Sequence, residues 1–353
     1  MQEKVLMKGN EAIAEAAILA GCHHYFGYPI TPQTEISAYM AKKMPKIGGT
    51  FLQAESELAA INMVYGVAST GKLAMTSSSS PGIALKAEGI SYLAGCDLPA
   101  LIVNVQRGGP GLGGIQPSQS DYSLATKSPG HGDFHILVLA PATVQEMADL
   151  TFKAFELARK YRMPAMLLAD GTMGQMMEPV ALPEARDPGN APDWAATGTE
   201  MKRPHNIINS LYLEPSLLEI ENFKRYERYN LIEETEPMWE EFMMDDAEIC
   251  IVSTGIAARV SRNAIVEARA QGIKVGMIRP KTLWPFPKKP LLEAAGRVKS
   301  FISVEMSMGQ MRQDVELAIR CSRPVDLCCR VGGMIPTPDD VMSHIKKANQ
   351  EGG

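Results

Sequence analysis

The stretch "HYFGYPITPQTE", residues 24–35, passes from an apolar, aromatic run into a loop that holds Thr31 between Pro29 and Pro32. Proline fixes its own φ angle and restricts the residue before it, so the backbone on both sides of this hydroxyl is stiff. The segment 31–44 that follows carries apolar residues at helical spacing. The sequence therefore predicts a short strand, a stiff loop and a helix, which together are the unit of an α/β fold.

The same alternation of strand and helix continues on both sides of this unit as far as residue 180. The predicted strands are nearly continuous apolar runs, which are typical of a parallel sheet covered on both faces. Further strands are predicted at residues 49–55, 72–80, 99–106, 134–141 and 164–170. Further helices are predicted at residues 9–20, 56–70, 81–95 and 143–161. We therefore expect a doubly wound parallel α/β sheet over residues 1–185.

The composition of the chain shifts after residue 185. Residues 186–246 are first rich in Pro, Ala and Gly without periodicity and then strongly charged, which predicts a linker and a charged helical segment. A second alternation of strands and helices covers residues 247–353. Because 353 residues are enough for two domains, we expect a smaller α/β domain after the linker.

Charge and cysteine usage exclude several classes of protein. The formal net charge is -5 with both signs spread along the chain, which does not fit nucleic-acid binding. None of the six cysteines is spaced C-x-x-C, so the sequence predicts no iron–sulfur cluster in this chain. It also lacks a membrane-length apolar run and a signal-peptide pattern. We expect a cytoplasmic protein with reduced thiols and neither a membrane nor a nucleic-acid partner.

Polar side chains gather where the predicted strands of the first domain end. Thr31 follows the first strand, Glu55 and Glu57 follow the second, serines 77–80 the third, and Arg107 the fourth. The carboxyl ends of parallel strands lie at one edge of a sheet, where ligands bind. An arginine can hold a carboxylate by two hydrogen bonds, and a buried glutamate can exchange a proton with a ring nitrogen. The sequence thus predicts an anion-binding, proton-handling site at this edge.

Each of these residues also has a purely structural interpretation. The threonine can simply cap the helix that starts at Pro32, and the two glutamates can be helix-start acids favoured by the helix dipole. The serines can form only a turn, and Arg107 can pair with Asp121. The run "GGPGLGG" at residues 108–114 fits neither common phosphate-loop pattern, so its glycines predict a mobile loop.

Four motifs occur in an order that is more specific than any one of them: "GYPITPQTE", "QAESELAAINMVYGVASTG", "AMTSSSSPGIAL" and "NVQRGGPGLGGIQPSQSD". In this order the chain resembles the alpha subunit of the 2-oxoacid:ferredoxin oxidoreductases. The resemblance continues into "STGIAARVSRNAIVEARAQGIKVGMIRPKTLWPFP" and covers nearly the whole chain. Within the family, "GGPGLGGIQPSQSDY" with "HGDFH" is most similar to the branched-chain, or 2-oxoisovalerate, group. It departs from the "GPSTG" form of this loop, which is similar to that of 2-oxoglutarate enzymes.

The resemblance implies a pyrimidine-type thiamine-diphosphate-binding domain over residues 1–185 and a transketolase C-terminal-like domain over residues 247–353. The active site would lie between this chain and a separate beta subunit that binds the diphosphate and Mg2+. No Gly-Asp-Gly motif with a downstream Asn occurs here, so we expect no metal site in this chain. Iron–sulfur clusters would come from a gamma or delta subunit. We expect a dimer of heteromers that uses ferredoxin and coenzyme A.

The resemblance also implies roles for individual residues. Glu57 would contact N1′ of the aminopyrimidine, since counting back from Gly66 matches the family spacing, and Glu55 is the alternative. Thr31 would hydrogen-bond the 2-oxo acid near the thiamine, and Arg107 would hold the substrate carboxylate. The remaining cofactor contacts expected at this edge are Pro29, Ile30 and Ser79.

The activity implied by the resemblance is oxidative decarboxylation of a 2-oxo acid to an acyl-CoA and CO2, with electrons passed to ferredoxin. A branched-chain 2-oxo acid is the expected substrate, and 2-oxoglutarate is the alternative. Two other interpretations stay open, namely a thiamine-dependent decarboxylase without a redox step and a scaffold subunit without catalysis. The joint retention of Thr31, Glu57 and Arg107 argues against the scaffold.

Overall fold

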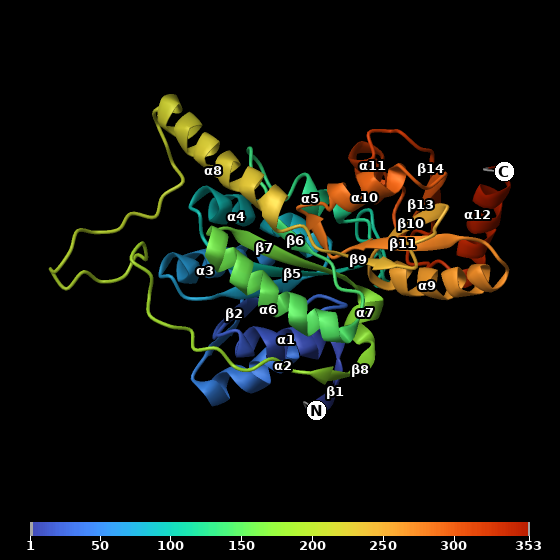
Figure 1. Cartoon of the computed structure of the whole chain (residues 1–353). Helices are drawn as coiled ribbons and strands as arrows, with labels where there is room; N and C mark the ends of the chain where they lie inside the picture. Colours follow the sequence, from blue (N-terminus) through green and yellow to red (C-terminus); the bar gives the residue numbers. More distant parts are fainter. Residues whose placement is uncertain (1–2, 352–353) are drawn as a thin grey trace.

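A computed structural model describes residues 3–351 of the chain. Its central element is a seven-stranded sheet, which lies beside a second sheet of five strands (Figure 1). The seven strands, in their spatial order, are β12 (Thr282–Trp284), β6 (Leu137–Leu139), β7 (Pro164–Asp170), β5 (Ala100–Gln106), β4 (Met75–Ser78), β2 (His24–Gly27) and β3 (Thr50–Gln53). All neighbours from β6 to β3 pair in parallel. The parallel sheet predicted from the sequence is therefore confirmed.

Burial along the strands explains their order in this sheet. Every residue of β5 and β7 is buried, and these two strands pair in the middle of the sheet. Strands covered by helices on both faces read as continuous apolar runs. In contrast, β3 lies at the edge, where its Leu52 is exposed. The continuous apolar runs thus form the centre of the sheet, and β3, which is less apolar, forms one edge.

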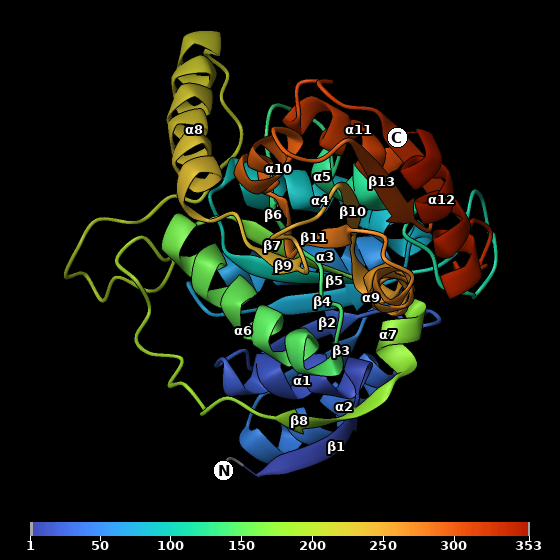
Figure 2. The same cartoon turned by 45° about the vertical axis from the view of Figure 1, so that its right-hand side comes forward.

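Helices cover both faces of the seven-stranded sheet, as Figure 2 shows. Three helices pack together on one face: α1 (Gly9–Leu19), α2 (Thr34–Lys43) and α6 (Val144–Tyr161). Two helices pack together on the other face: α3 (Glu57–Ser69) and α4 (Pro81–Gly95). The strand order reverses beside β2, so the connection from β2 to β3 and the connections from β3 to β4 and β5 run in opposite directions across the sheet. Because crossovers between parallel strands are right-handed, their helices lie on opposite faces.

The second sheet is built by the later part of the chain. Its strands, in order, are β14 (Val325–Cys329), β13 (Ser300–Glu305), β10 (Ile249–Ser253), β11 (Val275–Pro280) and β9 (Trp239–Phe242). The first four pair in parallel, and β9 is antiparallel. The helices of this region are α9 (Gly255–Ala270), α10 (Lys288–Ala295), α11 (Gln310–Ala318) and α12 (Pro338–Glu351). Strand β9 lies within the segment for which charge patterning predicts helix.

Strand β12 joins the two halves of the chain. It follows β11 in the sequence but pairs antiparallel with β6 of the seven-stranded sheet. The backbone amide of Ala140 also donates to the carbonyl of Lys281 at 2.8 Å. The division into residues 1–185, 186–246 and 247–353 stays a prediction, and β12 is a part of the last segment that belongs to the first sheet.

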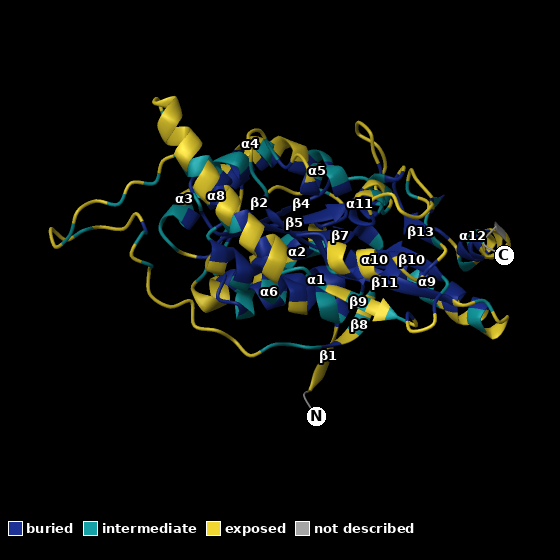
Figure 3. Cartoon of the chain, turned by 45° about the horizontal axis from the view of Figure 1, so that its top comes forward, coloured by how far each residue is buried: buried dark blue, intermediate teal, exposed yellow. Residues whose placement is uncertain are grey.

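The charged helical segment and the linker stand partly away from the two sheets. Helix α8 (Pro215–Thr235) projects from the body, and residues 182–214 form a long arm without helix or strand (Figures 1 and 3). The buried residues of α8 are Arg225, Tyr229 and Ile232, in its second half. Arg225 ties the helix to the body by donating to the carbonyl of Gly95 at 2.5 Å.

Several short elements were not predicted from the sequence. Besides β9 and β12, they are the antiparallel pair β1 (Lys4–Lys8) and β8 (Met177–Ala181), the helices α5 (Tyr122–Thr126) and α7 (Gly171–Gln175), and the 3-10 helix η1 (Met44–Ile47). Within residues 3–351 no helix has the length and apolar character that crossing a bilayer requires.

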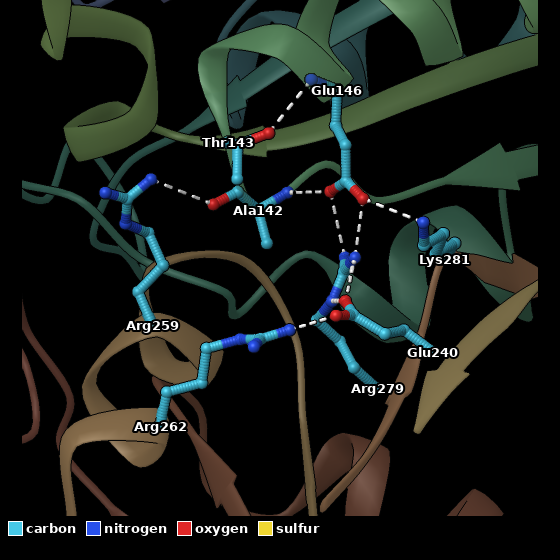
Figure 4. A network of polar contacts seen from close by, with 8 residues as sticks. All are labelled: Ala142, Thr143, Glu146, Glu240, Arg259, Arg262, Arg279 and Lys281. Atoms are coloured by element: carbon cyan, nitrogen blue, oxygen red, sulfur yellow. Dashed lines mark hydrogen bonds and ion pairs between the residues drawn. The ribbon is translucent and has the colours of Figure 1, made fainter. Parts of the chain in front are cut away.

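A charged junction holds β9 and β11 against α6 (Figure 4). Arg279, which is almost fully buried, donates to both Glu146 oxygens at 2.5 and 3.0 Å and to Glu240 at 2.6 Å. Lys281 pairs with Glu146 at 3.0 Å, and Arg262 pairs with Glu240. A cavity of about 730 Å³ opens beside these residues. Because each cation here already has a carboxylate partner, we assign the cluster to joining the two sheets.

Candidate functional site

Glu57 lies in a buried position at the first turn of α3. Ser56 caps this helix by accepting a hydrogen bond from the amide of Ala59 at 3.1 Å, so Glu57 is not needed as the cap. The Glu57 side chain is only 6% exposed. Within residues 3–351 its carboxylate has neither a hydrogen-bond nor an ion-pair partner. Glu55, by comparison, directly precedes the capping residue Ser56 and is exposed to solvent. A buried carboxylate without a partner is costly, which makes Glu57 a strong candidate for ligand binding.

The Glu57 carboxylate is packed against the first turn of α4. A Cβ atom added at Gly82 would lie 2.6 Å from Glu57 Oε1 and 2.1 Å from Ser78 Oγ. Gly82 is buried and directly follows Pro81, the first residue of α4. The absence of a side chain at Gly82 is therefore what allows the carboxylate of α3 to approach α4.

The serine run at the end of β4 contributes hydroxyls of two kinds. Ser77 is bonded on both sides, with its Oγ 2.7 Å from the hydroxyl of Tyr25 and 2.5 Å from Oε1 of Gln33. The hydroxyls of Ser78 and Ser79 are fully buried and have no partner within the described residues. The sequence singled out Ser79 as a cofactor contact, and both free hydroxyls remain available for one.

Ser80 connects the serine run to the strand that carries Arg107. Its Oγ donates to Asp121 Oδ2 at 2.6 Å and accepts from the backbone amide of Arg107 at 3.0 Å. Asn104 donates to the same Asp121 oxygen at 2.8 Å. Burial raises the pKa of Asp121, although the hydrogen bonds from Ser80 and Asn104 oppose this shift. This network fixes the end of β5 against the end of β4.

Arg107 is brought to the Thr31 loop, as the shared strand edge predicts. Its Nη1 donates to the carbonyl of Thr31 at 3.0 Å, and its Nη2 donates to the carbonyl of Leu112 at 3.3 Å. The guanidinium does not pair with Asp121, which was the structural alternative. The side chain is 8% exposed, and its buried Nε has no partner within residues 3–351. The arginine therefore meets only neutral carbonyls and keeps a donor free for an anion.

Thr31 does not cap the helix that follows it. Helix α2 begins at Thr34, with Gln33 in the capping position, so the helix starts later than Pro32. Asn10, on α1, holds the loop by donating to the carbonyl of Pro32 at 2.8 Å. The Thr31 side chain is exposed, and its hydroxyl makes no hydrogen bond within the described residues. The hydroxyl is thus free to bind a ligand beside Arg107.

The other predicted contacts of the loop are Pro29 and Ile30. Pro29 is exposed and Ile30 is half-buried, and both lie between β2 and α2. Gln33 closes the loop by donating to the carbonyl of Tyr28 at 3.3 Å, and the amide of Gln33 donates to the carbonyl of Ile30 at 3.3 Å. The loop is therefore ordered by its own hydrogen bonds.

The residues at this edge fit one half of a thiamine diphosphate site. The Glu57 carboxylate, which has no hydrogen-bond partner within residues 3–351, can accept a hydrogen bond from a protonated ring nitrogen, and Gly82 leaves the space that this carboxylate occupies. Within residues 3–351 there is no cluster of three or more His, Cys, Asp or Glu side chains that could hold a metal ion. The arrangement can thus orient a heterocycle and a carboxylate.

Two residues that lie beside the candidate site were not predicted from the sequence. Gln119 clamps the loop after β5 to the second sheet, because its side chain donates to the carbonyl of Thr254 at 2.9 Å and accepts from the amide of Met306 at 3.0 Å. Lys86 is fully buried in α4, close to Glu57. Lys86 could have been noticed in the sequence, because it is a lysine within the largely apolar run "GIALKAEGI". No local sequence pattern distinguishes Gln119.

Two protein families match the chain. Residues 15–222 match the family described as pyruvate flavodoxin/ferredoxin oxidoreductase, thiamine diphosphate-binding. Residues 247–341 match the family described as pyruvate:ferredoxin oxidoreductase core domain II. The first match includes every predicted site residue, and together with the sheet topology it confirms the predicted α/β fold class with a thiamine-diphosphate-binding domain.

Individual proteins are similar over most of the chain. The ketoisovalerate oxidoreductase subunit VorB of Methanothermobacter marburgensis is 50% identical over 344 residues, which are 97% of each chain. The 2-oxoglutarate synthase subunit KorA of Methanothermobacter thermautotrophicus is 34% identical and covers 99% of this chain and 100% of its own. Among solved structures, the 2-oxoglutarate:ferredoxin oxidoreductase of Magnetococcus marinus matches with a TM-score of 0.88 and 29% identity. That match covers 99% of this chain and 66% of the other.

Proposed function

This chain belongs to the 2-oxoacid:ferredoxin oxidoreductase family, and we propose that it is the alpha subunit that holds the aminopyrimidine of thiamine diphosphate beside a 2-oxo acid. The observation that carries the proposal is the buried Glu57 carboxylate, which has no hydrogen-bond or direct ion-pair partner within residues 3–351 and lies against Gly82. A site of this kind is completed by a ligand that donates to the carboxylate.

The main task of Glu57 is to hold a proton at the cofactor ring. Its carboxylate would accept a hydrogen bond from N1′ in the protonated form of the ring, in a buried position where such a bond is stronger than in water. Ser56 caps the helix, so the carboxylate stays free for this bond. Thiamine diphosphate, when bound, supplies the electron sink that decarboxylation of a 2-oxo acid requires. Glu55 is the weaker candidate because it is exposed.

Arg107 and Thr31 orient the substrate. The guanidinium binds the substrate carboxylate with its donors, and the Thr31 hydroxyl donates a hydrogen bond to a substrate oxygen. Because Arg107 already contacts the Thr31 carbonyl at 3.0 Å, one substrate can reach both residues. Fixing the carboxylate in one orientation lowers the entropic part of the barrier to loss of CO2. Pro29, Ile30 and Ser79 complete the cofactor side of the site in this proposal.

A branched-chain 2-oxo acid is the substrate that we propose, and coenzyme A and ferredoxin are the co-substrates. The VorB relative, which is named for ketoisovalerate, is 50% identical, whereas the KorA relative, which is named for 2-oxoglutarate, is 34% identical. A beta subunit would bind Mg2+ and the diphosphate, and a gamma or delta subunit would carry the iron–sulfur clusters. We also propose a dimer of heteromers in the cytoplasm, and the free cysteines support a reducing compartment.

The complex purified from its native source, with all its subunits, tests this proposal. Initial rates of ferredoxin reduction are measured with coenzyme A and, in turn, 2-oxoisovalerate, pyruvate, 2-oxoglutarate and an aryl pyruvate. We expect the highest kcat/KM for 2-oxoisovalerate. Pyruvate, which lacks two carbons of its side chain, should be lower by at least about 10–200-fold, because a single methylene in an apolar pocket already contributes about 1–3 kcal/mol. A complex that contains no thiamine diphosphate, or reduces no ferredoxin with any of these acids, refutes the proposal. The highest kcat/KM for 2-oxoglutarate would favour the alternative substrate.

A further inference from the structure

Lys86 is a lysine with no exposed surface in the middle of helix α4. Lysine is almost never fully buried unless it is paired, because its ammonium group loses its hydration. The amine of Lys86 donates to the carbonyl of Ser77 at 3.2 Å. A single neutral carbonyl does not compensate for the burial of a full charge, so the position of this lysine calls for a further partner.

The position of Lys86 on α4 directs it toward Glu57. Residues 82 and 86 are one helical turn apart and lie on the same face. Gly82, on that face, is the residue that meets the Glu57 carboxylate. The carbonyl of Ser77 that accepts from Lys86 directly precedes Ser78, whose hydroxyl also meets Gly82. The amine and the carboxylate therefore approach the same end of β4 from α4 and α3.

The charges of the two groups are coupled. Burial lowers the pKa of Lys86 to about 7, and the negative charge of Glu57 opposes this shift. The other titratable groups near this end of β4 include Tyr25 of β2, whose hydroxyl lies 2.7 Å from Ser77 Oγ and whose pKa is raised by burial, and Asp121, which accepts a hydrogen bond from Ser80. Gln33, which also contacts Ser77, is neutral. Glu57 is the carboxylate whose charge acts on the pKa of Lys86, although the two side chains do not form a direct ion pair within residues 3–351.

We propose that Lys86 is a positioning residue for Glu57: its ammonium balances the charge of the buried carboxylate and holds that carboxylate in place for the aminopyrimidine of the cofactor. This inference rests on the proposed function, because it takes Glu57 to be the cofactor contact. Lys86 itself touches neither cofactor nor substrate. Its effect passes through the carboxylate, so it should disappear when the carboxylate is removed.

The effect of Lys86 should also depend on pH. The amine carries its charge below a pKa of about 7 and loses it as the pH rises above that value. At high pH the wild-type protein therefore resembles a variant with a neutral side chain at position 86. A lysine that only fills space, or only holds the Ser77 carbonyl, would show no such dependence.

A double-mutant cycle on the assembled complex tests the proposal. The wild type, Lys86→Met, Glu57→Gln and the double variant are stripped of thiamine diphosphate, and the Kd for the cofactor with Mg2+ is measured by calorimetry. At about pH 6 we expect Lys86→Met to weaken binding about tenfold, the factor that corresponds to one pKa unit of interaction. In the Glu57→Gln background we expect the same change to have no effect, because coupled residues are not additive. Lys72→Met, at an exposed lysine outside the site, is the control and should leave the Kd unchanged.

The pH series separates a charge effect from a structural one. At about pH 8.5 we expect the ratio of the Kd values of Lys86→Met and wild type to fall toward one. Titration of the diphosphate cancels in this ratio, since both proteins are measured at the same pH. If Lys86→Met does not assemble, the Kd ratio of Glu57→Gln to wild type is followed instead, and it should decrease as the pH rises through 7.

Two outcomes would overturn the role of Lys86. One is an equal loss of affinity from Lys86→Met with and without Glu57, which indicates a packing role only. The other is a Kd ratio that does not change between the two pH values. Both outcomes leave the proposed function intact, provided that Glu57→Gln weakens cofactor binding. A wild-type complex that binds no thiamine diphosphate would instead refute the proposed function itself.

Discussion

Replacing Gly82 by alanine should displace the Glu57 carboxylate while leaving α4 helical. The new methyl group would lie 2.1 Å from Ser78 Oγ and 2.6 Å from Glu57 Oε1. Both atoms must withdraw to about 3.0 Å or more, the shortest separation that real Cβ contacts show. Gly82 has no left-handed backbone angle, so alanine adds no backbone strain there. The perturbation is therefore a steric push on two side chains of the site.

The cost of Gly82→Ala should fall on the site more than on the fold. Alanine in place of glycine favours a helix by about 1 kcal/mol. Overpacking a filled space costs about 1–3 kcal/mol. The two effects together predict a loss of about 0–2 kcal/mol of unfolding free energy. A catalytic group misplaced by about 1 Å can cost about 100-fold in rate, so we expect the smaller shift of Glu57 to weaken cofactor affinity about tenfold.

Two other glycines of the same helix pair provide matched controls. At Gly66, on α3, a Cβ meets no atom within 4 Å, so Gly66→Ala should stabilise the protein by about 0.5–1 kcal/mol without changing cofactor affinity. At Gly89, on α4, a Cβ would lie 2.5 Å from Ile61 Cγ2. Gly89→Ala therefore strains the packing of α3 on α4 without a direct clash with Glu57.

The assay compares the three variants as assembled complexes. The Kd for thiamine diphosphate is measured by calorimetry, and the midpoint of thermal unfolding is recorded in the absence of the cofactor. Gly82→Ala with the affinity of Gly66→Ala would refute the placement of Glu57 at the cofactor. An equal loss of affinity in Gly82→Ala and Gly89→Ala would attribute the effect to general strain between the helices.

Three further results are expected. Glu57→Gln should lower kcat at least about 100-fold, as loss of a proton-handling group does, and Glu55→Gln should leave it unchanged because Glu55 is exposed. Arg107→Lys should raise the KM for the 2-oxo acid about tenfold or more with little change in cofactor affinity, since lysine cannot form the two-pronged bond; an unchanged KM would exclude Arg107 from the substrate site. Burial opposes the ionisation of Glu146, but the hydrogen bonds and charge of Arg279 outweigh it and lower the pKa below 4.5. The unfolding midpoint should therefore fall as the pH drops below about 4.5, and less steeply in Arg279→Met, whereas equal slopes in the two proteins would contradict this.

The elements that could be predicted from the sequence are those whose pattern is local. Strands β5 and β7 are continuous apolar runs and are buried along their whole length. Strand β9 reads "WEEF" within a charged segment and forms only because β11 offers it an edge. Strand β12 likewise pairs with β6, which lies more than 130 residues earlier. A local sequence pattern contains no information about so distant a partner strand. For this reason the edge strands β9 and β12 were not predicted.

The predicted site residues meet at one edge because their strands are neighbours, which the α/β pattern implies. The choice between Glu55 and Glu57 needed more than the pattern, because both lie near the start of α3. The Ser56 cap places Glu57 inside the helix and leaves Glu55 outside it. In the opening stretch, the sequence could not place the start of α2, since Pro32 suits a first turn as well as a loop. Asn10 of α1 donates to the carbonyl of Pro32 and so holds Pro32 in the loop before α2.

The clamp at Gln119 makes the substrate side of the site depend on both sheets. Gln119 joins the loop after β5 to Thr254 and Met306, which directly follow β10 and β13 of the later sheet. Asp121, two residues on, is bonded through Ser80 to the backbone of Arg107. The second sheet is therefore connected to Arg107 through three hydrogen-bonded steps. A long-range coupling of this kind arises from tertiary contacts, which neither composition nor periodicity contains. Residues that set the geometry of Arg107 thus lie in a part of the chain that holds none of the predicted site residues.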